Sequence, residues 1–185
     1  MPRIAPAEAP YSPAIATELE RIMPAEMEPL ILLRTMARSP RVFGKMFAGG
    51  LLDKGPLSLR QREIVILRIG YLCRSGYEWA QHVRIGLDAG LTEGEVSRIK
   101  YGPAASAWEE RDRAMLRAVD DLTSDFFVSS KNWDALTFLT DRQKMDLVLT
   151  VGQYTQVSML LNSFGVQPEP DLALDPDVTD YEAAA

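Results

Sequence analysis

The chain's single histidine, His82, stands at helical spacing from two polar residues that could share its chemistry. Ser75, Glu78 and His82 follow one another at i, i+3 and i+7, so their side chains fall on one face of an α-helix. Glu63 lies in the segment just before, within the run REIVILRIG. Two carboxylates and an imidazole on neighbouring helices can transfer protons at neutral pH without a cofactor. We therefore take His82, Glu63 and Glu78 as candidate catalytic residues.

Each of these residues also has a purely structural interpretation. The helix face around Glu63 is apolar, so Glu63 is either a proton-accepting base or half of an ion pair with an arginine such as Arg60 or Arg84. His82 is either a hydrogen-bonded structural histidine or a general acid–base. In the catalytic interpretation Glu78, one turn earlier, holds one ring nitrogen and leaves the other free for a substrate.

Four further residues are candidates for substrate binding: Ser75, Trp79, Arg84 and Tyr154. Ser75 either donates a hydrogen bond into the site or only caps the helix that follows it. Trp79 either stacks on a substrate or packs in the core. An anionic group could be held by Arg74 or Arg84 through paired hydrogen bonds, unless both are solvated surface residues.

Metal and nucleotide sites have little support. Glu63, Glu78 and His82 could offer two oxygens and one nitrogen to a metal, but the chain has no second histidine and no HExxH pattern. It also has no glycine-rich phosphate loop. We expect neither a metal nor a cofactor.

The composition is that of one ordinary globular domain. The chain has 185 residues, of which 46% are hydrophobic and 25% charged, and its net charge is −6. This charge disfavours nucleic acid and anionic membranes as partners but permits a local basic pocket. With one cysteine, Cys73, no intrachain disulfide can form, which fits a cytoplasmic location. We find neither a signal peptide nor an apolar run of about 18 residues.

The elements that must position these residues are predicted to be helices throughout. No run of β-branched residues alternates with a period of two, so a sheet is not expected. Capping-box patterns mark four helix starts, at Ser58–Gln61, Thr92–Glu95, Ser106–Glu109 and Thr140–Gln143. One predicted helix begins at Ser12-Pro13. The others cover residues 26–39, 58–73, the segment that carries His82 up to Gly90, 93–101, 107–123 and 141–163. The last is apolar nearly all round, which favours burial and a subunit interface.

The run REIVILRIG…YEWAQHVRIGLDAGLTEGEVSRI and the later VGQYTQVSMLLNSFGV resemble the carboxymuconolactone decarboxylase family, whose relatives include alkylhydroperoxidase D-like proteins. The resemblance implies an all-α, alkylhydroperoxidase D-like helical bundle that assembles as a trimer or hexamer. It covers residues 40–166, preceded by an N-terminal helical extension (1–39). The acidic, proline-containing tail (167–185) is expected to be extended, disordered or strapped across a neighbouring subunit.

The hydroperoxidase branch of this family carries two cysteines between the glutamate and the histidine. Glu63 and His82 match the ends of that motif, but Ser75 and Glu78 stand at the cysteine positions. Neither side chain can replace a thiolate. Peroxidase chemistry of the two-cysteine type is therefore not expected, and a single-cysteine peroxidase using Cys73 is a minor alternative.

The decarboxylase branch needs no cysteine and no cofactor. The resemblance implies a lyase acting on a small carboxylated or lactone-like molecule, with His82 as general acid–base, Glu78 orienting it and Glu63 as a second proton-transfer group. Gln153, Tyr154 and Asn162 could line the same cavity. The alternative from a different class is a non-enzymatic ligand-binding or assembly protein, in which the Glu/His cluster is a structural network. Expected partners are a small-molecule substrate and further copies of the chain.

Overall fold

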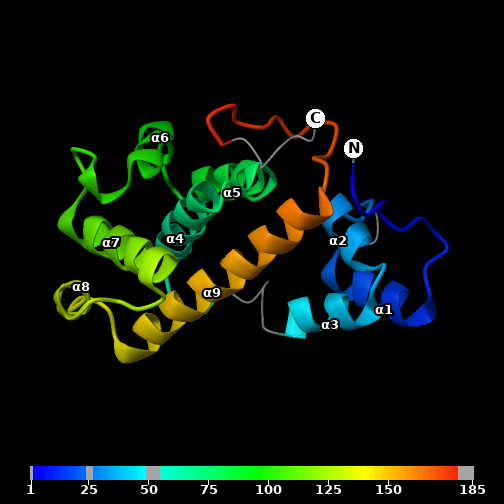
Figure 1. Ribbon diagram of the computed structural model, residues 1–185, viewed down its shortest axis with the longest axis horizontal. Helices are drawn as coiled ribbons and strands as arrows, with labels where there is room; N and C mark the ends of the chain where they lie inside the picture. Colours follow the sequence, from blue (N-terminus) through cyan, green and yellow to red (C-terminus); the bar gives the residue numbers. More distant parts are fainter. Residues whose placement is uncertain (1, 24–26, 49–54, 179–185) are drawn as a thin grey trace.

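The computed structural model describes residues 2–23, 27–48 and 55–178. Within these ranges every regular element is a helix and no strand occurs, which confirms the predicted all-α fold. The elements are α1 (Pro13–Ile22), α2 (Ile31–Met36), α3 (Pro40–Ala48), α4 (Leu59–Leu72), α5 (Gly76–Asp88), α6 (Glu93–Tyr101), the 3-10 turn η1 (Gly102–Ala104), α7 (Glu110–Asp125), α8 (Ser130–Asp134) and α9 (Asp141–Phe164). In Figure 1, α9 runs diagonally across the molecule, with α1–α3 on one side and α6–α8 on the other.

Three of the four predicted capping boxes are present. Ser58, Thr92 and Thr140 each accept a hydrogen bond from the backbone three residues on, and the Gln or Glu there reaches back. The fourth prediction was wrong: α7 begins at Glu110, and Ser106 caps nothing. Ala107 has a positive φ of 65°, and the Trp108 indole donates to the Gly102 carbonyl at 3.1 Å, so these residues form a turn instead.

The N-terminal part differs from the prediction of one helix over 26–39. Among the residues described there, only Ile31–Met36 are helical. Pro40 was expected to end that helix, but it stands at the start of α3, where a proline costs no backbone hydrogen bond. The apolar residues that follow it form the inner face of α3, with Phe43 and Met46 buried.

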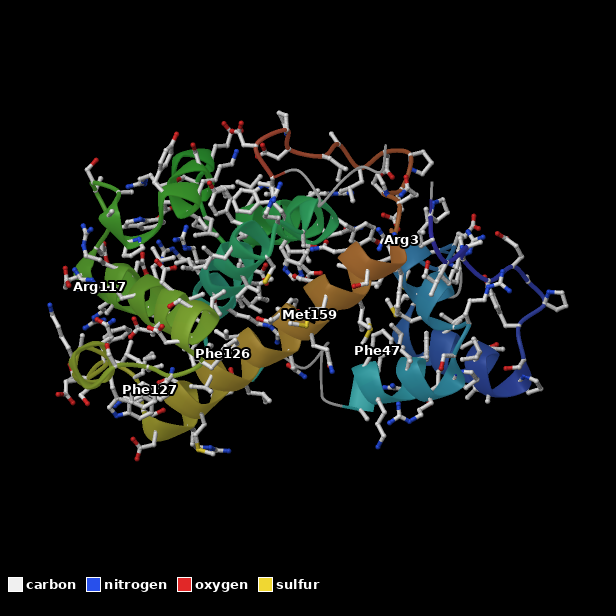
Figure 2. The ribbon with its side chains drawn as sticks, viewed as in Figure 1. Arg3, Phe47, Arg117, Phe126, Phe127 and Met159 are labelled. Carbon is white, nitrogen blue, oxygen red and sulfur yellow. The ribbon has the colours of Figure 1, made fainter. Side chains whose placement is uncertain are left out.

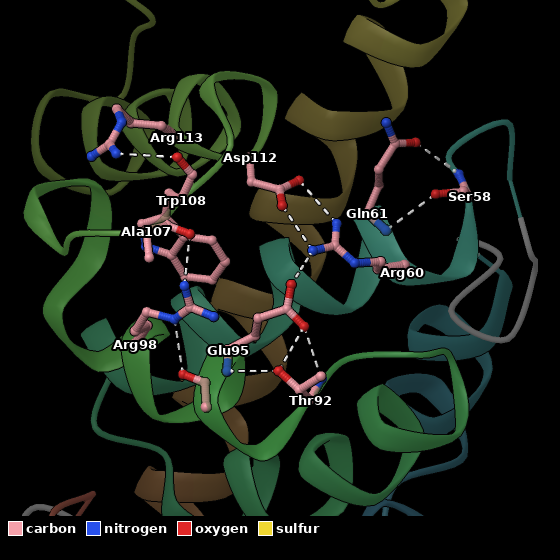
Figure 3. A network of polar contacts seen from close by, with 11 residues as sticks. Ser58, Arg60, Gln61, Thr92, Glu95, Arg98, Ala107, Trp108, Asp112 and Arg113 are labelled. Carbon is pink, nitrogen blue, oxygen red and sulfur yellow. Dashed lines mark hydrogen bonds and ion pairs between the residues drawn. The ribbon is translucent and has the colours of Figure 1, made fainter.

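Helix α4 is the centre of the fold. It contacts α5, α6, α7 and α9, and the eight residues from Glu63 to Gly70 are all buried. Figure 3 shows how its first turn is fixed: Arg60 donates two hydrogen bonds to Asp112 of α7, at 2.8 and 3.0 Å, and a third to Glu95 of α6. One ionic cluster thus joins three helices.

Helix α9 is buried on one side only. Leu147, Val151 and Leu161 lie in the main core, whereas Met145, Leu149 and Met159 are exposed. Figure 2 shows Met159 on the outer side of α9, with Phe126 and Phe127 on the loop after α7. This exposed apolar surface is compatible with the predicted subunit interface, which stays a prediction.

The C-terminal segment does not need a neighbouring subunit to hold it. Residues 167–178, here called the strap, lie across α5 of the same chain (Figure 1). Glu169 accepts hydrogen bonds from Tyr77 at 2.9 Å and Gln81 at 3.0 Å, while Leu172 and Val178 are buried. The rest of the predicted tail, 179–185, falls outside the described residues.

The N-terminal extension shares the main core with the predicted central domain. Ile15, Leu19 and Leu33 belong to the same buried cluster as residues of α4 and α9. The domain boundaries at 39/40 and 166/167 stay predictions.

Candidate functional site

The candidate site lies where α4 and α5 pack closely together. Glycines make this approach possible: a Cβ at Gly70 would stand 3.4 Å from the Trp79 backbone nitrogen, and one at Gly86 would stand 3.0 Å from a Leu91 methyl carbon and 3.7 Å from the Glu63 Cβ. Gly86 is one turn beyond His82. The packing therefore brings the His82 face of α5 against Glu63 of α4.

The structure places His82 between two carboxylates. Its Nδ1 lies 2.7 Å from Glu63 Oε2, and its Nε2 lies 3.3 Å from Glu78 Oε1. The Glu63 and Glu78 side chains are only 4% and 5% exposed, and that of His82 is 13% exposed. We call these three residues the Glu–His–Glu cluster. The structure thus unites all three predicted catalytic residues.

The charge on His82 is set by two opposing effects. Burial lowers the pKa of the imidazole, but hydrogen bonds and charge interactions with Glu63 and Glu78 outweigh it and raise the pKa to about 9. A pKa of about 9 favours the imidazolium form of His82 at neutral pH. The expectation that one ring nitrogen is free was wrong, because Nδ1 hydrogen-bonds with Glu63 and Nε2 lies within ion-pair distance of Glu78.

Glu63 has neither of the arginine partners considered from the sequence. Arg60 pairs with Asp112 and Glu95, and Arg84 lies 3.7 Å from Asp171 on the strap. The ion-pair interpretation of Glu63 holds only with His82 as the partner.

Tyr154 and Arg62 complete the surroundings of His82. The Tyr154 ring meets the imidazole edge-on, with centroids 5.1 Å apart, and its hydroxyl accepts a hydrogen bond from Arg62 Nη2 at 3.3 Å. Burial, with the charge of Glu78, raises the pKa of Tyr154 to about 12, so the hydroxyl keeps its proton. Tyr154 was predicted, but Arg62 was missed. Its helical position is about 100° round from Glu63, so spacing alone did not place it here.

Ser75 and Cys73 lie near the cluster in different roles. Ser75 precedes α5, but its side chain makes no cap bond, and its buried Oγ has no hydrogen-bond partner. Burial raises the pKa of the Cys73 thiol, and the nearby hydroxyls of Thr155 and Ser158 lower it by less. The Ser158 Oγ is buried and makes no hydrogen bond. A half-buried thiol with a raised pKa is not an activated nucleophile.

Two predicted substrate-binding residues lie elsewhere. Trp79 and Arg84 line a cavity of about 570 Å³ between α5, α6 and the strap, which contains no residue of the Glu–His–Glu cluster. Trp79 is 1% exposed and packs in the second core cluster. Asn162, proposed for the site cavity, donates to the Cys73 carbonyl at 2.9 Å and so fixes the turn before α5.

In the ranges described, no group of three or more His, Cys, Asp or Glu side chains is arranged to hold a metal ion. None of the helices described there is long and apolar enough to cross a membrane.

The chain is similar to known proteins in sequence pattern and in fold. Residues 40–121 match the model of the carboxymuconolactone decarboxylase family. No curated protein matches the sequence. Among solved structures, an uncharacterized peroxidase-related protein from Ralstonia eutropha, an alkylhydroperoxidase AhpD core, is 17% identical, with a TM-score of 0.77 over 91% of this chain and 94% of that one.

Two other solved structures share the fold. An uncharacterized peroxidase-related protein from Silicibacter sp. has a TM-score of 0.75 at 15% identity, covering 91% of each chain. A variant of the debrominase Bmp8 in complex with 2,3,4-tribromopyrrole has a TM-score of 0.73 at 11% identity, over 90% of this chain and 91% of that one. The family model spans the segment that carries the Glu–His–Glu cluster, and the fold is shared along most of the chain: over residues 40–121 the protein is similar to the carboxymuconolactone decarboxylase family, and its fold is alkylhydroperoxidase D-like.

Proposed function

We propose that the protein is a cofactor-free acid–base enzyme, a lyase resembling carboxymuconolactone decarboxylase, that acts on a small carboxylated or lactone-like molecule. The observation that carries this proposal is the position of the His82 imidazole between two buried carboxylates, which raise its pKa to about 9. A protonated imidazole beside a carboxylate can act as the general acid that protonates carbon after the substrate's carboxylate leaves as CO2.

The two contacts of His82 differ in length, which favours different roles for the two ring nitrogens. The shorter one, from Nδ1 to Glu63 at 2.7 Å, fixes the ring, whereas the 3.3 Å contact from Nε2 to Glu78 is the easier to open. We assign proton donation to Nε2, with Glu78 as the group that yields its place to the substrate. This exchanges the roles expected from the sequence for Glu63 and Glu78.

The proposed step balances without an external oxidant or reductant. The bond to the carboxylate carbon breaks, CO2 leaves, and the electron pair stays on the substrate, delocalised into its carbonyl group. The proton on His82 Nε2 then adds to carbon, and water restores the imidazolium. Tyr154 and Arg62, beside the ring, are proposed to bind the substrate's oxygen atoms.

A thiol peroxidase is a weaker candidate. Ser75 and Glu78 replace the cysteines of that branch, and the pKa of Cys73 is raised rather than lowered. The competing proposal is a structural network, and a specific observation favours it: both ring nitrogens of His82 are already paired inside the protein.

Deuterium exchange separates the two proposals. The protein is incubated in D2O with a panel of carboxylated γ-lactones and β-keto acids, and both loss of CO2 and deuterium entry at carbon are followed by NMR. We expect turnover by the native protein, abolished in His82→Ala and Glu63→Gln, and retained in the control Glu93→Gln, which alters an exposed carboxylate on α6. Turnover that persists in both site variants would contradict the enzyme proposal.

Homo-oligomeric assembly and a cytoplasmic location belong to the same proposal. The exposed apolar side chains of α9 and of the loop after α7 support the first. Light scattering on the purified protein tests it, with a trimer or hexamer expected. A monomer at micromolar concentration would contradict it.

A further inference from the structure

The cavity between α5, α6 and the strap lies on the side of α5 away from the Glu–His–Glu cluster. Its volume is about 570 Å³, within the range of small-molecule sites. Val83 and Leu87 of α5, Val96 of α6, and Leu172 and Leu174 of the strap give it mainly apolar walls. We propose that this cavity is a binding site for an uncharged, apolar small molecule, separate from the proposed catalytic site.

The charges at the cavity point to an uncharged ligand because they are paired with one another. Lys100 lies 2.6 Å from Asp175 and 2.9 Å from Asp177, and Arg84 lies 3.7 Å from Asp171. The Lys100 pairing lowers the pKa of Asp175, although burial alone would raise it. A charged ligand would have to compete with the Lys100–Asp175 pair, whose side chains are 14% and 25% exposed, whereas an apolar one would not. The Arg84–Asp171 pair is exposed and contributes little to this argument.

The one other charged residue that lines the cavity does not change this conclusion. Glu93 is exposed and lies in the first turn of α6, where the helix N-terminus favours a negative charge. It therefore needs no ligand cation to balance it.

The strap covers one side of the cavity and is held in place at both of its ends. At one end Glu169 accepts hydrogen bonds from Tyr77, Gln81 and the Ile31 backbone, at 2.9, 3.0 and 2.9 Å. At the other end Lys100 forms ion pairs with Asp175 and Asp177. Figure 1 shows the strap running across α5. An open cavity of this size, with mainly apolar walls and one side held in place by two anchors, fits a small-molecule site.

A pair of probes with the same ring system tests the proposal. N-phenyl-1-naphthylamine is neutral, and 1-anilinonaphthalene-8-sulfonate carries an added sulfonate; both fluoresce in apolar surroundings. We expect saturable binding of the neutral probe to the full chain, with the anionic probe at least about tenfold weaker. Equal affinity for the two probes would overturn the assignment to uncharged ligands.

Variants locate the bound probe. Val83→Trp fills the cavity from α5, and Ser97→Trp fills it from an exposed position on α6 that tolerates a larger side chain. Each should weaken binding of the neutral probe by about tenfold or more. The control Met159→Glu changes the exposed apolar side of α9 and should leave the affinity unchanged. Binding that survives both filled variants, or is lost in Met159→Glu, would overturn the site. No saturable binding at all would do the same.

Discussion

The proposed function depends on the charge state of His82, which can be measured directly in this chain. His82 is the only histidine, so its ring protons give one histidine signal in an NMR pH titration. We expect this signal to titrate at about 9 instead of the ordinary 6.5. In Glu63→Gln, burial remains but the closest carboxylate is lost, so the pKa should fall markedly.

The difference between the pKa of His82 in the folded protein and in the unfolded chain also affects stability. The folded protein binds the His82 proton more tightly than the unfolded chain does, so this contribution is fully present below about pH 6.5 and is lost as the pH rises to about 9. At about 1.4 kcal/mol per pH unit, the gap corresponds to about 3 kcal/mol. The free energy of unfolding of the native protein should therefore fall by that order across this range.

Urea unfolding at pH 6.5 and pH 9 measures this loss, with His82→Gln as the control for other titrating groups. The variant should lose much less stability over the same range than the native protein. Two results together would refute the proposal that two carboxylates stabilise a His82 imidazolium. His82 would titrate near 6.5, and the free energy of unfolding would change with pH in the same way in both proteins.

Three further predictions concern neighbouring residues. Arg68→Ala should lower the free energy of unfolding by about 3 kcal/mol in urea titrations, because Arg68 is buried and bonded to both carboxylate oxygens of Asp120; a loss below about 1 kcal/mol would mean that this pair is not formed. Ser75→Ala should leave stability unchanged or slightly raised, since its buried hydroxyl has no partner; a clear loss in the same assay would reveal a partner. Cys73 should react with iodoacetamide at pH 7 more slowly than a free cysteine, as followed by mass spectrometry, because burial raises its pKa; faster alkylation would restore the single-cysteine peroxidase.

Much of the fold could be read from local patterns. Three capping boxes place the starts of α4, α6 and α9 within a residue, since a cap depends on neighbours within four positions. The fourth failed because Trp108, bonded to the Gly102 carbonyl, forms a turn where helix was expected. Around Pro40 the same residue type could end one helix or begin the next, and local sequence did not decide between them.

The candidate site divides in the same way. Helical spacing alone puts Glu78 and His82 on one face of α5, and the polar residue in the apolar run of α4 marks Glu63 as the partner. Which ring nitrogen meets which carboxylate depends on the rotation and distance of α4 against α5, set by glycines at their contact and by packing in the core. These are long-range properties that no spacing rule contains.

The opposite face of α5 shows the limit most clearly. Arg84, two residues beyond His82, looked like a substrate ligand, yet a helix turns by about 200° over two residues, and Arg84 faces the strap instead. The strap itself reaches α5 through Glu169 and Lys100, partners separated from their contacts by tens of residues. The sequence by itself determined the helices and which residues share a face of each. Only the tertiary structure decided what each face meets, because that depends on how distant segments pack together.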